Sequence, residues 1–299
     1  MLQNKSEDTP PVTDIGLVTM AFGRQKYFDQ AEHLARSLRL HMPDFKICLI
    51  SDRDYESPLF DLVVNMGTVE TAGTVLKCRM YELSPFDETF FIDSDCIAVR
   101  DFSDELSRIR KWNFSPVCET YLRAGDEDLW LEDVGTSLDA VGGVAFPKFN
   151  GGVYFFRKCS QAESFFETSL DILKNSKELG VLDFDSAGPG EETIFGLALA
   201  KLQSVDLYDD QGKLMRTPLN SKGKIEFSVL KGVCRIVKNG KLCEPAIGHF
   251  CGEWASHPIY KLAQVSLKTG LEPTLIQRIS AFLPYYFERA KRKFSVRTA

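Results

Sequence analysis

Short apolar segments alternate with amphipathic ones through the first third of the chain, and this alternation constrains the fold most strongly. Apolar runs occupy residues 15–20, 46–50, 62–64 and 90–92. Between the first two runs, the three-four spacing of one buried helix face is kept by Phe28, Ala31, Leu34, Ala35 and Leu38, and Pro43 ends the pattern. A second helical pattern covers residues 74–83. Strand and helix in alternation predict a parallel α/β sheet, whose ligands bind at the carboxyl ends of the strands.

The middle of the chain is less regular. Residues 119–143 are acidic and punctuated by glycine, and we expect a loop-rich insertion there. Residues 152–156 are expected to form a buried strand, residues 162–173 and 193–202 helices, and residues 182–190 a loop. Residues 225–242 alternate in polarity around Asn239-Gly240, which is a hairpin-turn signal.

The two ends of the chain differ from the body. Residues 1–12 are polar and are expected to be disordered, residues 13–258 to form one catalytic domain, and residues 259–299 to form a helical extension. From Gly270 onward, apolar and basic residues are interleaved, with Pro284 expected to interrupt any continuous helix. Two interpretations stay open: residues 271–299 lie on an anionic membrane surface, or they form a terminal helix packed on the domain.

Composition narrows the classes of partner. The 299 residues carry a net charge of -6, which disfavours a nucleic-acid-binding protein. No export signal and no membrane-spanning apolar run is recognised, and the eight cysteines are scattered, so reduced thiols are expected. These features predict a cytoplasmic location, either free or at the inner face of a membrane. Nothing in the sequence fixes the oligomeric state.

The strongest chemical signal is Asp93-Ser94-Asp95, directly after the apolar run at residues 90–92. Carboxylates are hard ligands suited to Mg²⁺ or Mn²⁺, and an ion held there would bridge a diphosphate. Two alternatives exist: the aspartates form a turn, or Asp93 is the nucleophile of a phosphatase-like hydrolase. The hydrolase motif usually opens its domain and is followed by a threonine, and neither holds here.

Two further segments carry candidate site residues. Asn150-Gly151-Gly152 precedes a predicted strand, where glycines permit close approach of the backbone and Asn150 offers a donor and an acceptor. Taken alone, this segment also fits a glycine turn that enters a buried strand. His249 lies in a segment that also contains His257, and a neutral imidazole is a common metal ligand.

Together these residues resemble the GT-A glycosyltransferases, and within them family 8, which contains retaining galactosyl-, glucosyl- and glycogenin-like enzymes. The likeness covers residues 14–258 by the order of its motifs, and its closest part is residues 83–95. It implies an α/β fold with a Rossmann-like mixed sheet, helices on both faces and, here, a C-terminal helical tail that is basic and aromatic.

The resemblance also implies roles for individual residues. The metal, Mn²⁺ or Mg²⁺, would be held by Asp93, Asp95 and His249. The nucleotide-sugar donor, expected to be a UDP-sugar, would be bound by Thr19, Ala21, Tyr27, Lys77, Asp93, Ser94, Gly151, Gly152, Gly252 and His257. The catalytic residues would be Glu191, Glu192 and Asn150.

The implied reaction is transfer of a hexose, with retention of configuration, to a hydroxyl of a glycan or glycolipid. The family often has Asp-Gln where this chain has Glu191-Glu192, and a lysine where this chain has His257. A non-catalytic relative that binds a nucleotide or glycan is the remaining alternative.

Overall fold

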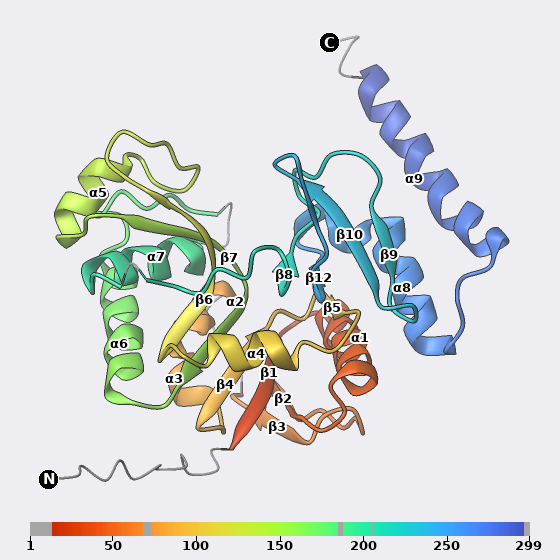
Figure 1. Ribbon diagram of the computed structural model, residues 1–299, viewed down its shortest axis with the longest axis horizontal. Helices are drawn as coiled ribbons and strands as arrows, with labels where there is room; N and C mark the ends of the chain where they lie inside the picture. Colours follow the sequence, from red (N-terminus) through yellow and green to blue (C-terminus); the bar gives the residue numbers. More distant parts are fainter. Residues whose placement is uncertain (1–13, 68–72, 185–187, 205, 296–299) are drawn as a thin grey trace, which may run out of the picture.

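The computed structural model describes residues 14–67, 73–184, 188–204 and 206–295 (Figure 1). The expected disordered segment at residues 1–12 lies outside the described residues. None of the helices described is long and apolar enough to cross a bilayer.

A six-stranded mixed sheet forms the centre of the molecule, in the order β3-β2-β1-β4-β7-β6. Its strands are β1 (Ile15–Ala21), β2 (Lys46–Ser51), β3 (Leu62–Asn65), β4 (Glu88–Ile92), β6 (Phe114–Leu122) and β7 (Phe146–Arg157). The first four run parallel, as the alternating pattern predicts, whereas β7 is antiparallel to both β4 and β6. The mixed sheet confirms the predicted fold class.

Neighbouring residues of each central strand point to opposite faces and build two separate cores. Phe91 belongs to the core under α6 (Ser160–Lys174) and α7 (Glu191–Lys201). Phe90 belongs to the core under α1 (Gln25–His41) and α4 (Ser103–Ile109). Because both faces of the sheet are covered, these strands read as continuous apolar runs rather than alternating ones.

The region expected to be a loop, residues 119–143, contains regular structure, so this prediction was wrong. Strand β6 continues to Leu122, which pairs with Phe146 of β7. Helix α5 (Val134–Val141) begins where the Asp133 carboxylate accepts from the Thr136 N–H at 2.6 Å, and it ends at Gly142 with φ of 71°. Long-range strand pairing and one capped turn explain why local composition was misleading here.

The helix expected at residues 74–83 is broken into three short pieces. Helix α2 (Gly73–Leu76) leads into the 3₁₀ turn η1 (Lys77–Arg79), and α3 (Met80–Leu83) follows. The tighter turn lies at Lys77, and mid-helix 3₁₀ geometry of this kind often accompanies a functional position.

Two small sheets complete the body. Strands β5 (Cys96–Ala98), β12 (Ile247–His249) and β8 (Met215–Arg216) form the first, with β5 and β12 antiparallel. Strands β9 (Glu226–Ser228), β10 (Val233–Lys238) and β11 (Lys241–Cys243) form the second. The predicted hairpin turn joins β10 to β11, with φ of 51° at Asn239 and 76° at Gly240.

The C-terminal segment follows the 3₁₀ turn η3 (Gly252–Ser256) and contains α8 (Pro258–Thr269) and α9 (Leu275–Ser295). Figure 1 shows α9 starting beside α8 and running outward beyond the rest of the body. The helix continues through Pro284, so the expected interruption was wrong. The hydrogen bond that proline removes leaves a carbonyl, which water can reach on a helix as exposed as this one. The domain division at residue 258 stays a prediction.

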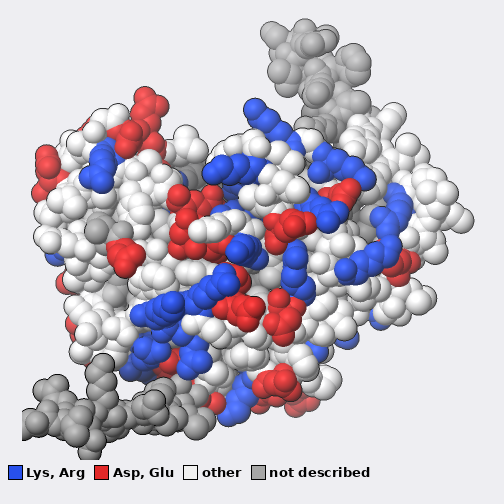
Figure 2. Space-filling model, viewed as in Figure 1, with Lys and Arg blue, Asp and Glu red and all other residues white. Residues whose placement is uncertain are grey.

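Charges are mixed on the surface. On the face shown in Figure 2, basic side chains gather around α4, and acidic side chains lie directly beside them.

Candidate functional site

Asp93 and Asp95 lie where β4 ends and the chain turns into β5. The turn is fixed by two backbone bonds: the Asp93 N–H donates to the Gly152 carbonyl at 2.8 Å, and the Cys96 N–H donates to the Asp93 carbonyl at 3.0 Å. Both carboxyl groups are less than a quarter exposed. The carboxyl end of the strand therefore holds two carboxylates in fixed positions.

His249 reaches these carboxylates because β12 pairs with β5. In the register of that pair His249 lies opposite Cys96, and the Phe250 N–H donates to the Asp95 carbonyl at 3.1 Å. The His249 Nε2 atom is 3.0 Å from Asp95 Oδ1 and 3.7 Å from Asp93 Oδ2. The structure thus brings together the three residues predicted to hold a metal.

Asn150 orients the histidine. The His249 Nδ1–H donates to Asn150 Oδ1 at 2.6 Å, and that oxygen also accepts from the Gly152 N–H at 3.1 Å. Since Nδ1 carries the proton in this bond, Nε2 is the nitrogen that faces the two aspartates. In this structure Asn150 therefore positions His249, whereas its predicted catalytic role stays untested.

Lys77 is the cation at the centre of the site. Its Nζ lies 2.8 Å from Asp93 Oδ1 and 2.6 Å from Glu191 Oε1, and it donates to the Gly151 carbonyl at 3.2 Å. Although burial lowers the pKa of Lys77, the two carboxylates raise it above its ordinary value, so the ammonium stays charged. We call Lys77, Asp93, Asp95, Asn150, Gly151, Gly152, Glu191, Glu192 and His249 the site cluster.

The two glycines are required by close approach of side chains to the backbone. A Cβ on Gly152 would lie 2.4 Å from His249 Nδ1, and a Cβ on Gly151 would lie 2.5 Å from Glu191 Oε1. The sequence suggested that these glycines admit a ligand. Here they admit other members of the site cluster.

Glu191 and Glu192 begin α7 but are held differently. Glu191 pairs with Lys77, whereas Glu192 Oε1 accepts from the Gly151 N–H at 2.7 Å. Burial, followed by the charge of Glu191, raises the pKa of Glu192 to about 7. Glu192 therefore titrates near neutrality.

The predicted metal ligands have opposing pKa shifts. Burial raises the pKa of Asp93, with Lys77 opposing this effect. Burial also acts on Asp95, but the nearby His249 lowers the pKa of Asp95 overall. Although burial lowers the pKa of His249, the Asp95 carboxylate raises it above its ordinary value. The pKa shifts of Asp95 and His249 thus have a common cause, which is the attraction between these two groups.

The residues fit a divalent ion. Neighbouring ligand atoms around an octahedral ion with bonds of about 2.1 Å are separated by about 3 Å. The Asp95–His249 separation of 3.0 Å matches this spacing, and Asp93 is slightly farther from His249 at 3.7 Å. Two carboxylates and one imidazole suit Mn²⁺ or Mg²⁺ better than a soft metal.

Cys96 is a neighbour that the sequence did not single out. Its Sγ lies within 4.8 Å of ligand atoms of Asp95 and His249. Burial raises the pKa of Cys96 well above its ordinary value, and the thiol donates to the Gly152 carbonyl at 3.8 Å. A neutral thiol is a poor metal ligand, so Asp93 remains the better third ligand.

Three of the residues predicted to bind the donor lie at the end of β1 and the start of α1. Thr19 and Ala21 are buried, and Tyr27 is 39% exposed. The Thr19 hydroxyl is buried with no hydrogen-bond partner among the described residues. Ser94 is half-buried in the turn between the two aspartates.

Asp52 was missed by the sequence analysis, although it directly follows β2. Its Oδ2 accepts from the Gly23 N–H at 2.7 Å, which fixes the loop between β1 and α1. The signal was an acidic residue at the carboxyl end of a parallel strand, where ligands bind in such sheets.

Gly252 and His257 lie in the turn that follows β12. Gly252 opens η3 with φ of 59°, which favours glycine. His257 caps α8, where its Nδ1 accepts from the Ile259 N–H at 3.2 Å, and its ring lies 4.3 Å from that of Trp254. These contacts give His257 a structural role, while its predicted contact with the donor stays untested.

Known structures share this fold, whereas no family model and no curated protein matches the sequence. The galactosyltransferase LgtC, in complex with donor and acceptor sugar analogs, matches with a TM-score of 0.54 and 14% identity, over 89% of this chain and 99% of that chain. The bifunctional glycosyltransferase WbbM in its apo form matches with a TM-score of 0.54 and 13% identity, over 94% of this chain and 53% of that chain.

The chain has a GT-A glycosyltransferase fold. The glycosyltransferase GlyE of Streptococcus pneumoniae TIGR4 matches with a TM-score of 0.40 and 18% identity, over 65% of this chain. The chain spans 44% of the length of GlyE and about half of WbbM, at 53%.

Proposed function

We propose that this protein is a metal-dependent glycosyltransferase that moves a hexose from a nucleotide-sugar, expected to be a UDP-sugar, to a hydroxyl of a glycan or glycolipid. The observation that carries the proposal is the convergence of Asp93, Asp95 and His249 at the carboxyl end of β4 in a GT-A fold. Carboxylates and an imidazole at that edge suit a divalent ion and a diphosphate.

The ion would be held by Asp93, Asp95 and the Nε2 atom of His249, with Asn150 fixing the ring. When bound, it supplies positive charge that stabilises the diphosphate as a leaving group. Lys77 keeps Asp93 in place through its ion pair. These groups would need little rearrangement during the reaction because backbone and side-chain bonds already fix them.

Glu191 and Glu192 are proposed to face the reacting sugar. Positive charge develops on the sugar carbon as the nucleotide leaves, and a carboxylate nearby stabilises it. Glu191 already neutralises Lys77, so Glu192 is the better candidate for this role. Retention of configuration is part of the proposal and rests on the resemblance to family 8.

The nucleobase is proposed to lie against the loop between β1 and α1, near Thr19, Ala21 and Tyr27. The Asp52–Gly23 hydrogen bond supports this placement, because it fixes the loop at the carboxyl edge of the sheet. Gly151, Gly152 and Gly252 would lie beside the donor through their backbone atoms.

The hydrolase alternative, in which Asp93 is a nucleophile, is less well supported. Asp93 follows β4, the fourth strand along the chain, whereas the nucleophile of such hydrolases usually opens its domain. The GT-A fold further favours sugar transfer. A non-catalytic relative would bind a nucleotide without turnover.

A donor-turnover assay tests the proposal. The wild type would be incubated with a panel of UDP- and GDP-hexoses and Mn²⁺, and nucleotide release measured with and without glycan acceptors. Release that requires Mn²⁺ and is lost in Asp95→Asn, but kept in the exposed control Asp171→Asn, supports transfer. Hydrolysis of a simple phosphate ester, trapped by beryllofluoride, would instead support the hydrolase.

We also propose that the extension, residues 259–299, meets an anionic membrane surface through residues 271–299, which would place the enzyme at the inner face of a membrane. Leu275, Ile276 and Leu283 are each more than two-thirds exposed on α9, and basic residues are interleaved with them. Co-sedimentation with anionic vesicles tests this. Equal binding by a chain that ends at Gly270 would contradict it.

A further inference from the structure

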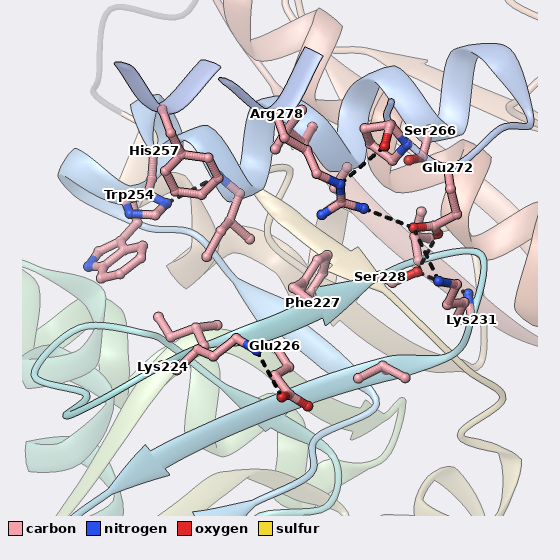
Figure 3. A pocket seen from close by; sticks show the side chains of 18 of the residues that line it. Lys224, Glu226, Phe227, Ser228, Lys231, Trp254, His257, Ser266, Glu272 and Arg278 are labelled. Atoms are coloured by element: carbon pink, nitrogen blue, oxygen red, sulfur yellow. Dashed lines mark hydrogen bonds and ion pairs between the residues drawn. The ribbon is translucent and has the colours of Figure 1, made fainter. Parts of the chain in front are cut away.

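A pocket of about 770 Å³ lies between β9, η3, α8 and α9 (Figure 3). None of its lining residues belongs to the site cluster. Its volume lies within the usual range of small-molecule sites, and such sites often form where separate structural units meet.

One wall of this pocket is aromatic. The ring of His257 lies 4.3 Å from that of Trp254 and 4.8 Å from that of Tyr285, and Phe282 stacks on Tyr286 at 5.9 Å. The aliphatic side chains of Val229, Ile259 and Leu262 also line the pocket. A ligand would therefore meet carbon along this wall, whereas polar side chains line the rest of the pocket.

The charged groups around the pocket already pair with one another. Glu272 is 3.2 Å from Arg278, 3.9 Å from Lys231, and accepts from the Ser228 hydroxyl at 2.5 Å, while Lys224 lies 3.3 Å from Glu226 (Figure 3). Recognition of a sugar needs donors and acceptors that the ligand can satisfy. Because these groups pair with each other, the aromatic and aliphatic wall is the part of the pocket that would hold a ligand, and it favours an apolar chain over a sugar.

We propose that this pocket binds the alkyl or isoprenoid chain of an amphiphile. The second line of support is the outer face of α9, where Leu275 is 73% exposed, Ile276 76% and Leu283 68%. The same helix thus carries exposed apolar residues next to Phe282 and Tyr285, which line the pocket. A chain leaving a lipid surface would pass from one apolar face to the other.

The pocket is connected to the site cluster along the chain. Trp254 and His257 belong to the segment that directly follows His249. A lipid-linked acceptor held by its chain would contact this segment. Its identity as acceptor rests on the proposed function, whereas binding of the chain does not.

Calorimetric titration with alkyl maltosides below their micelle-forming concentrations tests the proposal. The wild type should bind dodecyl maltoside and not maltose, and affinity should rise by up to about fourfold for each methylene added from the octyl to the dodecyl chain. Ile259→Trp, which fills the pocket, should weaken binding at least tenfold. Val265→Trp, the same enlargement of a half-buried β-branched residue on α8 outside the pocket lining, should not.

Two further variants keep the test decisive. Ile225→Trp fills the pocket from the β9 side and replaces Ile259→Trp if that variant does not fold. Ile279→Ser removes an exposed apolar residue of α9 that does not line the pocket, and should leave binding unchanged.

Equal binding of maltose, unchanged binding by both tryptophan variants that fill the pocket, or loss of binding only in Ile279→Ser would overturn the proposal. Mn²⁺-dependent UDP binding is measured on the same samples. Its absence would count against the proposed function alone.

Discussion

The site cluster and the C-terminal pocket use charge in opposite ways. In the site cluster, Lys77 and Glu191 are almost fully buried and pair with each other. Around the pocket, Lys224 and Lys231 are each more than two-thirds exposed, and their carboxylate partners lie on neighbouring segments. When a buried charge loses its partner, no water replaces that partner, and the protein is strongly destabilised. Exposed ion pairs contribute little to the free energy of unfolding. The comparison predicts that substitutions of charged residues have large effects in the site cluster and small effects around the C-terminal pocket.

The largest effect is expected from Lys77→Met. Removing this cation leaves Asp93 and Glu191 buried without their partner, which should lower the free energy of unfolding by about 3–5 kcal/mol. Urea denaturation would measure the change. Lys224→Met, which breaks an exposed pair of the C-terminal region, should change it by about 0.5 kcal/mol or less. Similar losses in both variants would remove the distinction between the two regions.

The next effect concerns pH. The pKa of Glu192 is about 7 in the folded state and 4.5 as its ordinary value, so the folded protein keeps a proton that the unfolded chain loses. This contribution to stability is fully present below pH 4.5 and is lost as pH rises through 7. Between pH 4.5 and pH values above 7, the contribution of Glu192 to the free energy of unfolding thus falls by about 3 kcal/mol.

Glu192→Gln should therefore lose less stability than the wild type between pH 5 and 7.5. Urea denaturation at several pH values would measure this, with the exposed Glu167→Gln as the matched loss of a carboxyl group. A wild-type slope retained in Glu192→Gln would mean that another group is responsible.

A smaller effect is expected from Gly152→Ala. The new Cβ would lie 2.4 Å from His249 Nδ1, so the ring must move away from Asp95. Displacing a ligand in this way should weaken Mn²⁺ binding about 10–100-fold, measured by calorimetry. Gly190→Ala is the matched control, because the described residues leave open space around its Cβ. Normal Mn²⁺ affinity in Gly152→Ala would show that His249 is not a ligand.

An effect smaller than these three is expected from Arg278→Ala. Arg278 is 44% exposed and pairs with Glu272 across the pocket edge, so its loss should lower the free energy of unfolding by less than about 1 kcal/mol. Thermal unfolding would measure it. A loss comparable with that of Lys77→Met would show that α9 is part of the folding core.

The same contrast explains what could be predicted from sequence. The parallel strands and the position of Asp93 and Asp95 follow from local patterns, since an apolar run and the residues after it suffice. The roles of Asn150 and Gly152 could not be predicted, because they depend on His249 arriving through the β5–β12 pairing. Strand β6 and helix α5 were missed for a related reason: β6 is specified by its partner β7 rather than by its own composition. The pocket depends on contacts among β9, α8 and α9, and no short motif encodes them.

The central claim is that Asp93, Asp95 and His249 hold a metal that binds a nucleotide diphosphate. Calorimetric titration with UDP, with and without Mn²⁺, on the wild type and on Asp95→Ala tests it most directly, with the exposed Asp171→Ala as control. The account predicts UDP binding that requires Mn²⁺, is lost in Asp95→Ala and is retained in Asp171→Ala. UDP binding of equal affinity without Mn²⁺, or unchanged in Asp95→Ala, would contradict it.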